Sequence, residues 1–332
     1  EVNRILGANS MYDVVKFNTA IEKKQMTLPL APQPAKVGET VYLLPYSTQK
    51  ATALQTGKVT AVDSIGNQSF YYTLEMKTGE KTISCPIMNI NGQVLGMIQK
   101  NASDDSMESY ALGASYGASL NISALSMNDG ALNNIGIKKA LPDTEDQALV
   151  YLYMSAEQLD KDSYLNILNE FLTQYPNSME GYVRRANYYM GSEDAAQYAQ
   201  ADADLKKALD VASVKEDAYY QVAKSIYGYV LSLNDKEPYQ EWTMDKALEL
   251  IRTAIQTNEQ PLHVQLEGDI LFAQGKYADA YASYEKFNQS TMASAASYYS
   301  AAKAKQLTEG SDINEVLALM DKAIEQLSKP YF

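Results

Sequence analysis

The sequence has very little of the chemistry that metal sites and internal cross-links require. Among its 332 residues there is one cysteine, Cys85, and one histidine, His263. A single thiol excludes a disulfide within the chain and any zinc site made of cysteines, and a lone imidazole has no second histidine with which to share a metal ion. We therefore expect Cys85, beside Pro86, to be a small core residue and His263 to be an ordinary residue at a helix start, with no metal or other cofactor.

Long apolar runs are missing as well. No run of about 18 apolar residues occurs, so the sequence predicts no membrane-spanning helix. The chain begins with Glu1 rather than with methionine, and removal of a secretory signal is the usual origin of such a start. From this we expect a location outside the cytoplasm, either periplasmic or secreted.

Basic residues are in deficit, and the deficit is confined to one part of the chain. The net charge is −13, from 28 Lys and Arg against 41 Asp and Glu. Residues 1–142 hold 12 basic and 11 acidic residues (+1), and residues 143–332 hold 16 and 30 (−14). The acidic half argues against nucleic acid as a partner. Two interpretations stay open, a solvated acidic surface and a surface that attracts a basic partner.

The residue pattern predicts two domains, residues 1–142 and 143–332. From residue 36 to about residue 98, short apolar runs alternate with turn residues such as Asn91-Gly92, which is typical of β-hairpins. After Pro142 the apolar period changes to about 3.6 residues, which is typical of helices. Tyrosine is abundant, with 26 against 6 Phe and 1 Trp, and because tyrosine is amphipathic we expect many half-buried rings.

One stretch of the first half carries a recognisable motif. The sequence KTISCPIMNINGQVLG, residues 81–96, has the spacing G-N/D-S-G-G-P-L-x-N-x-x-G-x-V-x-G at six positions: Pro86, Ile87, Asn89, Gly92, Val94 and Gly96. It resembles the nucleophile-bearing segment of chymotrypsin-like serine proteases of the HtrA type, and the runs KVGETVYLLPY and YDVVKF resemble the neighbouring strands. The resemblance covers about residues 1–125. It implies an antiparallel β-barrel of the trypsin-like type, whose first barrel is incomplete in this chain.

The same alignment predicts a protease site without its reactive groups. Ile83 stands at the position of the nucleophilic serine and has no nucleophilic atom. The flanking glycines are also replaced, and side chains there oppose the backbone turn that an oxyanion hole needs. Asp13 takes the position of the triad acid, although an aspartate that forms turn hydrogen bonds is an alternative interpretation. The triad histidine precedes the acid by tens of residues in this family, so it would lie before Glu1.

The second half repeats with a step of about 34 residues. Its clearest unit places Gly268, Leu271, Ala280 and Tyr284 at fixed intervals. This spacing resembles the tetratricopeptide (TPR) motif, in which small residues let paired helices pack closely while a large residue lies between them. Other units carry the corresponding residues: Ala186, Tyr189, Ala201, Leu205 and Ala208; Ala223, Ile226, Ala247, Ile251 and Ala254; Ala302, Val316, Met320 and Ala323. The first unit is the least regular, because Tyr164 and Phe171 stand where small residues are usual. The resemblance implies an all-α superhelix of four to five units.

By the pattern of the TPR family, the first helix of each unit lines a concave face that holds extended peptides or partner helices. The positions on that face nominate a set of partner-binding residues: Asn187, Met190, Tyr220, Lys224, Tyr227, Phe272, Tyr299 and Lys303. The aromatic members either anchor a partner or complete the packing of a tyrosine-rich array, and both interpretations stay open. The clamp with which some members hold a C-terminal carboxylate is not supported, because its repeated lysines and asparagines are missing.

Three functions are compatible with these patterns, and one of them, an assembly factor of the cell envelope, is supported only by the missing Met, the single Cys and the array. The favoured hypothesis is a non-catalytic interaction protein, in which a degenerate trypsin-like barrel acts as a platform and the TPR array recruits a peptide or protein. The alternative is an active serine endopeptidase whose array delivers substrates. That alternative needs a one-residue shift of the alignment, which makes Ser84 the nucleophile, and a histidine from upstream sequence.

Overall fold

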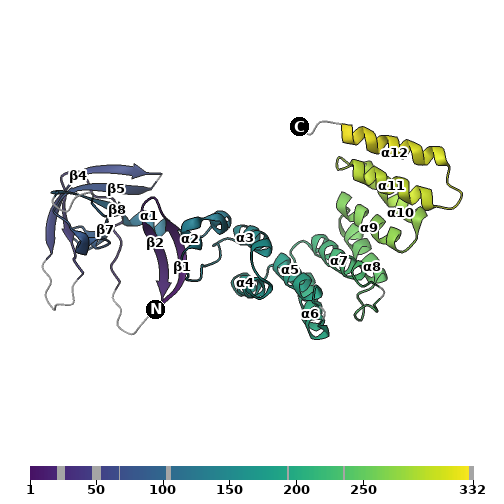
Figure 1. Ribbon diagram of the computed structural model, residues 1–332, viewed down its shortest axis with the longest axis horizontal. Helices are drawn as coiled ribbons and strands as arrows, with labels where there is room; N and C mark the ends of the chain where they lie inside the picture. Colours follow the sequence, from purple (N-terminus) through teal and green to yellow (C-terminus); the bar gives the residue numbers. More distant parts are fainter. Residues whose placement is uncertain are drawn as a thin grey trace. The chain divides into compact units, whose positions relative to one another are not determined.

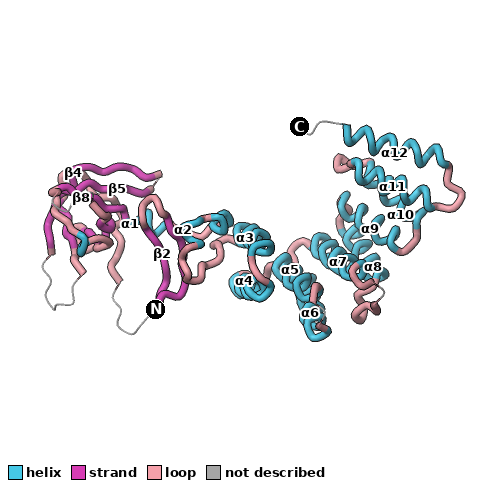
Figure 2. Tube along the Cα trace, in the orientation of Figure 1, coloured by secondary structure: helices cyan, strands magenta, loops and turns pink. Residues whose placement is uncertain are grey.

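The computed structural model describes residues 1–20, 27–46, 54–66, 68–101, 106–192, 194–234 and 236–328. The chain divides into two compact units, Glu1–Ser155 and Ala156–Phe332. The division falls within helix α3 (Glu145–Gln158), whereas the boundary expected from the sequence lies just before this helix. Every strand of the described residues belongs to the first unit, and the second unit is built from helices (Figures 1 and 2).

A closed, six-stranded antiparallel barrel forms the main part of the first unit. Its strands follow the order β3-β4-β5-β8-β7-β6 around the barrel. Their bounds are β3 (Thr40–Leu43), β4 (Gln55–Ile65), β5 (Ser69–Glu75), β6 (Pro86–Met88), β7 (Val94–Ile98) and β8 (Glu108–Gly113). The β-hairpins predicted from the short apolar runs, and the antiparallel barrel that the protease resemblance implies, are therefore confirmed. Closure gives each of these six strands a hydrogen-bonded neighbour on both sides.

Buried and more exposed side chains alternate along the strands, and the buried ones form the core of the barrel. In β3, Val41 and Leu43 are fully buried, and in β5 the inward positions are Tyr72 and Leu74. Cys85 is only 5% exposed, is not cross-linked, and packs in the same cluster. The prediction that its thiol is a small core group is confirmed.

Two glycines face each other where β7 pairs with β8. Gly96 is the register partner of Gly113. A Cβ atom at Gly96 would lie 2.5 Å from the backbone oxygen of Leu112, and one at Gly113 would lie 2.5 Å from that of Phe70. Because these neighbours are backbone atoms and cannot rotate away, both positions require glycine for the strands to close the barrel.

The turn predicted at Asn91-Gly92 joins β6 to β7. Gly92 has a φ of +73°, a left-handed conformation that glycine adopts without strain. The side-chain oxygen of Asn89 accepts hydrogen bonds from the backbone N–H groups of Asn91 and Gln93, each at 3.0 Å. Asn89 therefore holds the turn in place, and the turn forms without a catalytic serine at position 83.

A separate hairpin stands outside the closed barrel. Strands β1 (Val2–Asn9) and β2 (Val14–Thr19) form a two-stranded sheet of their own. The side chain of Lys16 donates hydrogen bonds to the carbonyl oxygens of Ala118 and Leu120, and so holds the hairpin against the end of helix α1 (Ala114–Ser119). The stretch YDVVKF, which resembles a protease barrel strand, lies in this hairpin. A further helix, α2 (Gly130–Asn133), and two 3₁₀ segments, η1 (Glu80–Thr82) and η2 (Ala124–Asn128), complete the unit.

The second unit consists of antiparallel helix pairs. Its helices are α4 (Lys161–Gln174), α5 (Met179–Met190), α6 (Ala195–Val211), α7 (Lys215–Leu231), α8 (Met244–Thr257), α9 (Pro261–Ala273), α10 (Tyr277–Asn288), α11 (Ala295–Leu307) and α12 (Ile313–Ser328). The pairs are α5 with α6, α7 with α8, α9 with α10 and α11 with α12, and consecutive pairs stack on one another. We call α5, α7, α9 and α11 the first helices of the pairs.

Small buried residues allow the helices of each pair to approach closely. Ala186, Ala201 and Ala208 are fully buried in the α5–α6 pair. In the α9–α10 pair, a Cβ atom at Gly268 would lie 2.8 Å from the ring of Tyr284, which is the large residue that the motif places between helices. The remaining small residues of the expected pattern are also buried: Ala223, Ala247, Ala254, Ala280, Ala302 and Ala323. The TPR-type helical array is therefore confirmed.

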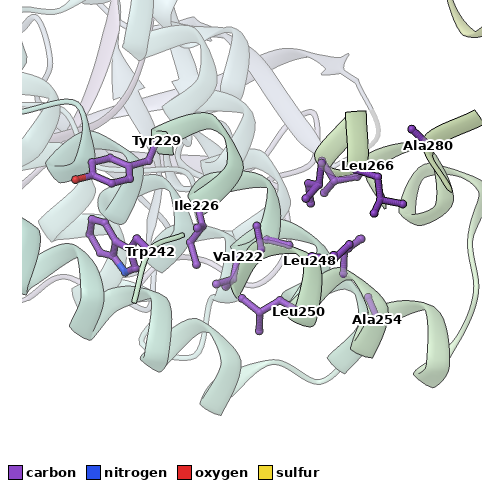
Figure 3. Packing of buried hydrophobic residues seen from close by; sticks show 14 of the residues in the cluster. Val222, Ile226, Tyr229, Trp242, Leu248, Leu250, Ala254, Leu266 and Ala280 are labelled. Atoms are coloured by element: carbon purple, nitrogen blue, oxygen red, sulfur yellow. The ribbon is translucent and has the colours of Figure 1, made fainter. Parts of the chain in front are cut away.

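The connection between α7 and α8 interrupts the regular step of the array. It carries the only tryptophan of the chain, Trp242, which is 3% exposed. The Trp242 ring packs against Tyr229 of α7, at 5.0 Å between ring centroids, and against Tyr198 of α6, at 5.9 Å. Figure 3 shows the rings of Tyr229 and Trp242 beside the aliphatic residues between α7 and α8. The buried indole therefore provides a natural fluorescent probe of the array.

Candidate functional site

The loop that aligns with the protease nucleophile is a hydrogen-bonded turn. Ile83 is half-buried directly after the 3₁₀ segment, and the next residue, Ser84, is exposed with a φ of +64°. The backbone N–H groups of residues 82–85 all donate to backbone carbonyl oxygens, at distances of 2.8–3.4 Å. An oxyanion hole needs two N–H groups that converge on empty space. None of these four N–H groups is free for that purpose.

Asp13 lies in the turn that joins β1 to β2. Its side chain is exposed, and its φ is +47°. Aspartate adopts this left-handed region more readily than most residues, which suits it to a turn. The hairpin is a different sheet from the barrel that carries Ile83. The assignment of Asp13 as a triad acid stays a prediction.

On the helical unit, a pocket of about 380 Å³ opens between α5 and α7. Three of the residues predicted to bind a partner lie together there. Asn187 and Lys224 are exposed on its rim, and Met190, which is 8% exposed, lies deeper in its wall. Gly228 also lines the pocket, and a Cβ atom at this position would meet no other atom within 4 Å. The pocket therefore combines an apolar wall with an amide and an ammonium group.

The repeat register connects this pocket to the next first helix. Asn187 follows the small residue Ala186, Lys224 follows Ala223, and Asp269 follows Gly268 in the equivalent place on α9. Since α5 packs on α7 and α7 packs on α9, equivalent residues form one row across neighbouring first helices. We call the surface around this row the first-helix face. Lys303 of α11 takes the same repeat position.

Asp269 is not among the residues predicted from the sequence, although its position directly after the small residue Gly268 is the signal that identifies it. Its half-buried carboxylate accepts a hydrogen bond of 2.7 Å from the hydroxyl of Tyr284. Burial raises the pKa of Asp269, and the hydrogen bond from Tyr284 lowers it in part. The carboxylate charge in turn helps to raise the pKa values of Tyr220 and Tyr227 on α7, for which burial is the larger cause. The Asp269 charge therefore disfavours ionisation of both tyrosine hydroxyls.

The remaining residues predicted to bind a partner differ in what they contact and in how far they are exposed. The ammonium group of Lys224 lies 5.8 Å from the ring centroid of Tyr220, whose other neighbour is the ring of His263, at 5.2 Å. His263 is 2% exposed near the start of α9, as expected, and burial lowers its pKa. Phe272 is half-buried against the core of the array, and its ring packs on that of Tyr277, at 5.3 Å between centroids. Tyr299 is 51% exposed on α11 and does not line the pocket between α5 and α7.

Neither a metal centre nor a membrane span emerges from the described residues. Within them, no group of three or more His, Cys, Asp or Glu side chains is arranged to hold a metal ion. The helices of the same residues include none with both the length and the apolar character needed to cross a bilayer.

The architecture is that of a closed β-barrel followed by a TPR-type helical array, and solved structures with each fold are similar to parts of the chain. MamA is 19% identical, with a TM-score of 0.39, over 53% of this chain and 94% of that chain. YrrB, described as a TPR protein with an unusual peptide-binding site, is 16% identical, with a TM-score of 0.37, over 55% of this chain and 86% of that one.

The barrel part has its own structural neighbour. The active form of the Rv3671c protease from M. tuberculosis is 21% identical, with a TM-score of 0.30, and the match covers 42% of this chain and 61% of that chain. These likenesses concern the fold alone. No protein-family model matches the chain, and no curated protein matches it.

Proposed function

We propose that this is a non-catalytic interaction protein, in which the first-helix face binds an extended segment of a partner and the barrel serves as a scaffold. The observation that carries the proposal is the pocket between α5 and α7. Its volume of about 380 Å³ falls within the range of about 300–1,000 Å³ that is typical of ligand sites. Met190 offers a deformable apolar wall, while Asn187 and Lys224 on the rim offer hydrogen-bond donors to a peptide backbone or carboxylate.

The backbone of the barrel loop supports the non-catalytic half of the proposal. A serine nucleophile needs an adjacent base and an oxyanion hole. The barrel has Ile83 at the aligned position, and the N–H groups of residues 82–85 are committed to carbonyl oxygens. The chain's histidine, His263, belongs to the helical unit. The barrel is then retained for its shape, since a fold and the chemistry it carries are separable. An extracytoplasmic location stays a prediction.

Labelling with a fluorophosphonate probe tests the non-catalytic assignment. We expect no covalent labelling of the wild-type chain, because Ser84 lies in a left-handed turn and its own N–H group is bonded to the carbonyl oxygen of Ile98. Mass spectrometry of the treated protein is the measurement, and the Ser84→Ala variant is the matched control. Labelling of the wild type that disappears in Ser84→Ala would identify a reactive serine and overturn the assignment.

Filling the pocket tests the binding half of the proposal. A phage-displayed peptide library is selected on the wild-type protein, and the affinity of the best peptide is then measured by fluorescence anisotropy. We expect Gly228→Leu to weaken binding by at least about tenfold, which corresponds to about 1.4 kcal/mol, because the new side chain occupies the pocket. The stability of helix α7 should not fall, because glycine inside a helix is unfavourable by about 1 kcal/mol relative to alanine.

The control for this experiment is Gln200→Leu, which adds the same side chain at an exposed position of α6. It should leave peptide affinity unchanged. If peptides selected on the wild type bind Gly228→Leu with full affinity, the pocket is not the binding site. If selection yields no peptide that binds the helical unit, the interaction role itself is contradicted.

A further inference from the structure

One half-buried carboxylate on the first-helix face, that of Asp269, forms no ion pair with any of the residues that the structure describes. Asp269 lies on α9, and the Tyr284 hydroxyl donates one hydrogen bond to it. Among the ion pairs of the described residues, which include Arg185 with Asp204 and Arg252 with Glu267, none involves Asp269. A carboxylate has about four acceptor positions, so a single donor leaves most of its capacity unused. Taking such a charge out of water is unfavourable unless it is paired.

Two tyrosines of the neighbouring first helix could contribute to binding a cation at Asp269. Tyr220 and Tyr227 lie half-buried on α7, which packs against α9, the helix that carries Asp269. A tyrosine ring attracts a cation to its face, and the ring of Tyr220 already has the ammonium group of Lys224 at 5.8 Å from its centroid. A carboxylate beside aromatic rings binds a lysine or arginine side chain through charge, hydrogen bonds and contact with its methylene stem.

We infer that Asp269, together with Tyr220 and Tyr227, accepts one lysine or arginine side chain of the segment bound along the first-helix face. This inference rests on the proposed function and specifies the chemistry of its partner. The equivalent position on α7, which packs against α9, carries Lys224, and the equivalent position on α11 carries Lys303. These two lysines disfavour a second basic residue in the bound segment, since like charges in one site repel. The preferred segment therefore holds a single basic residue rather than a basic run.

A double-mutant cycle between protein and peptide tests this inference. Peptides selected from the phage library on wild-type protein should share one Lys or Arg at a fixed place. The best peptide and its partner with glutamine at that place are then measured against wild type and Asp269→Asn. For the wild type, the basic peptide should bind at least tenfold more tightly than the glutamine peptide, and in Asp269→Asn the two should bind alike.

Two controls separate charge from folding. Asp279→Asn removes the same charge from an exposed position on α10 and should leave the preference for the basic peptide intact. Asparagine at 269 keeps an oxygen that can accept the Tyr284 hydrogen bond, and an unchanged urea midpoint of Trp242 fluorescence would verify that the array is intact. Rescue of the basic preference by Asp269→Glu would support a direct role for the carboxylate.

The outcomes distinguish the inference from the function on which it rests. Peptides that depend on Gly228 but carry no shared basic residue would overturn the inference and leave the binding function standing. A basic preference that survives in Asp269→Asn would also overturn it. A selection that yields no binding peptide would contradict the proposed function, and the inference with it.

Discussion

Replacement of Arg185 by alanine is expected to lower the free energy of unfolding of the helical unit by about 3–5 kcal/mol, the usual cost of removing one partner from a buried ion pair. Arg185 of α5 binds Asp204 of α6 through two hydrogen bonds of 2.8 Å, and it also donates to Asn169 of α4 at 2.9 Å. Asp204 is only 5% exposed. Without Arg185 its charge would be buried and unpaired, and three helices would lose their common contact.

Urea unfolding followed by Trp242 fluorescence and by helical circular dichroism measures this effect. The matched control is Lys207→Ala, which removes an exposed ion pair with Asp210 on α6 and should cost less than about 1 kcal/mol. Replacement of Arg185 and Asp204 together by Met and Leu should recover most of the loss, because no charge is then left without a partner. Equal losses for Arg185→Ala and Lys207→Ala would show that the pair is not structural.

Replacement of Phe171 by alanine is expected to cost about 3–5 kcal/mol, the range for removing a fully buried aromatic ring. Phe171 of α4 is completely buried. Its ring occupies the space in front of Gly181 of α5, where a Cβ atom would lie 2.5 Å from the ring. The ring and the glycine are therefore complementary, and each one depends on the other.

A double-mutant cycle tests that complementarity. Gly181→Ala alone should cost about 1–3 kcal/mol through overpacking, and the cost should vanish in the Phe171→Ala background, where the methyl group enters vacated space. The free energies of unfolding of the wild type, both single variants and the double variant give the coupling. Strictly additive losses would mean that the ring and the glycine do not meet.

The same pair shows what the sequence could and could not predict about the array. The spacing of small and large residues predicted the helix pairs from α5 to α12, because that spacing is local to each pair. Phe171 weakened the prediction for the first unit, since a small residue is usual there. The compensating Gly181 lies on the next helix, and pattern matching within one unit does not show which residue it faces.

In the barrel, turn chemistry was the informative signal. Asn91-Gly92 predicted the β6–β7 hairpin, whose glycine has the expected positive φ. The placement of β1 and β2 in a sheet of their own could not be predicted in the same way. Whether a strand joins a closed barrel depends on pairing between distant segments, which local alternation does not encode.

The candidate site was predicted only in part, for a related reason. Asn187, Met190 and Lys224 were nominated by family position, and the packing of α5 on α7 brings them to one pocket. Asp269 was not among the predicted residues. Its importance follows from the Tyr284 hydrogen bond and the absence of an ion pair among the described residues, and both are properties of tertiary structure.

Hydrogen–deuterium exchange of the full chain, with and without the best library-selected peptide, tests the central claim most directly. If the first-helix face binds partners while the barrel serves as a scaffold, the peptide should slow exchange in α5, α7 and α9 and leave the loop at residues 81–85 unchanged. Slowed exchange confined to that loop, with the first helices unaffected, would place binding in the barrel and contradict the account.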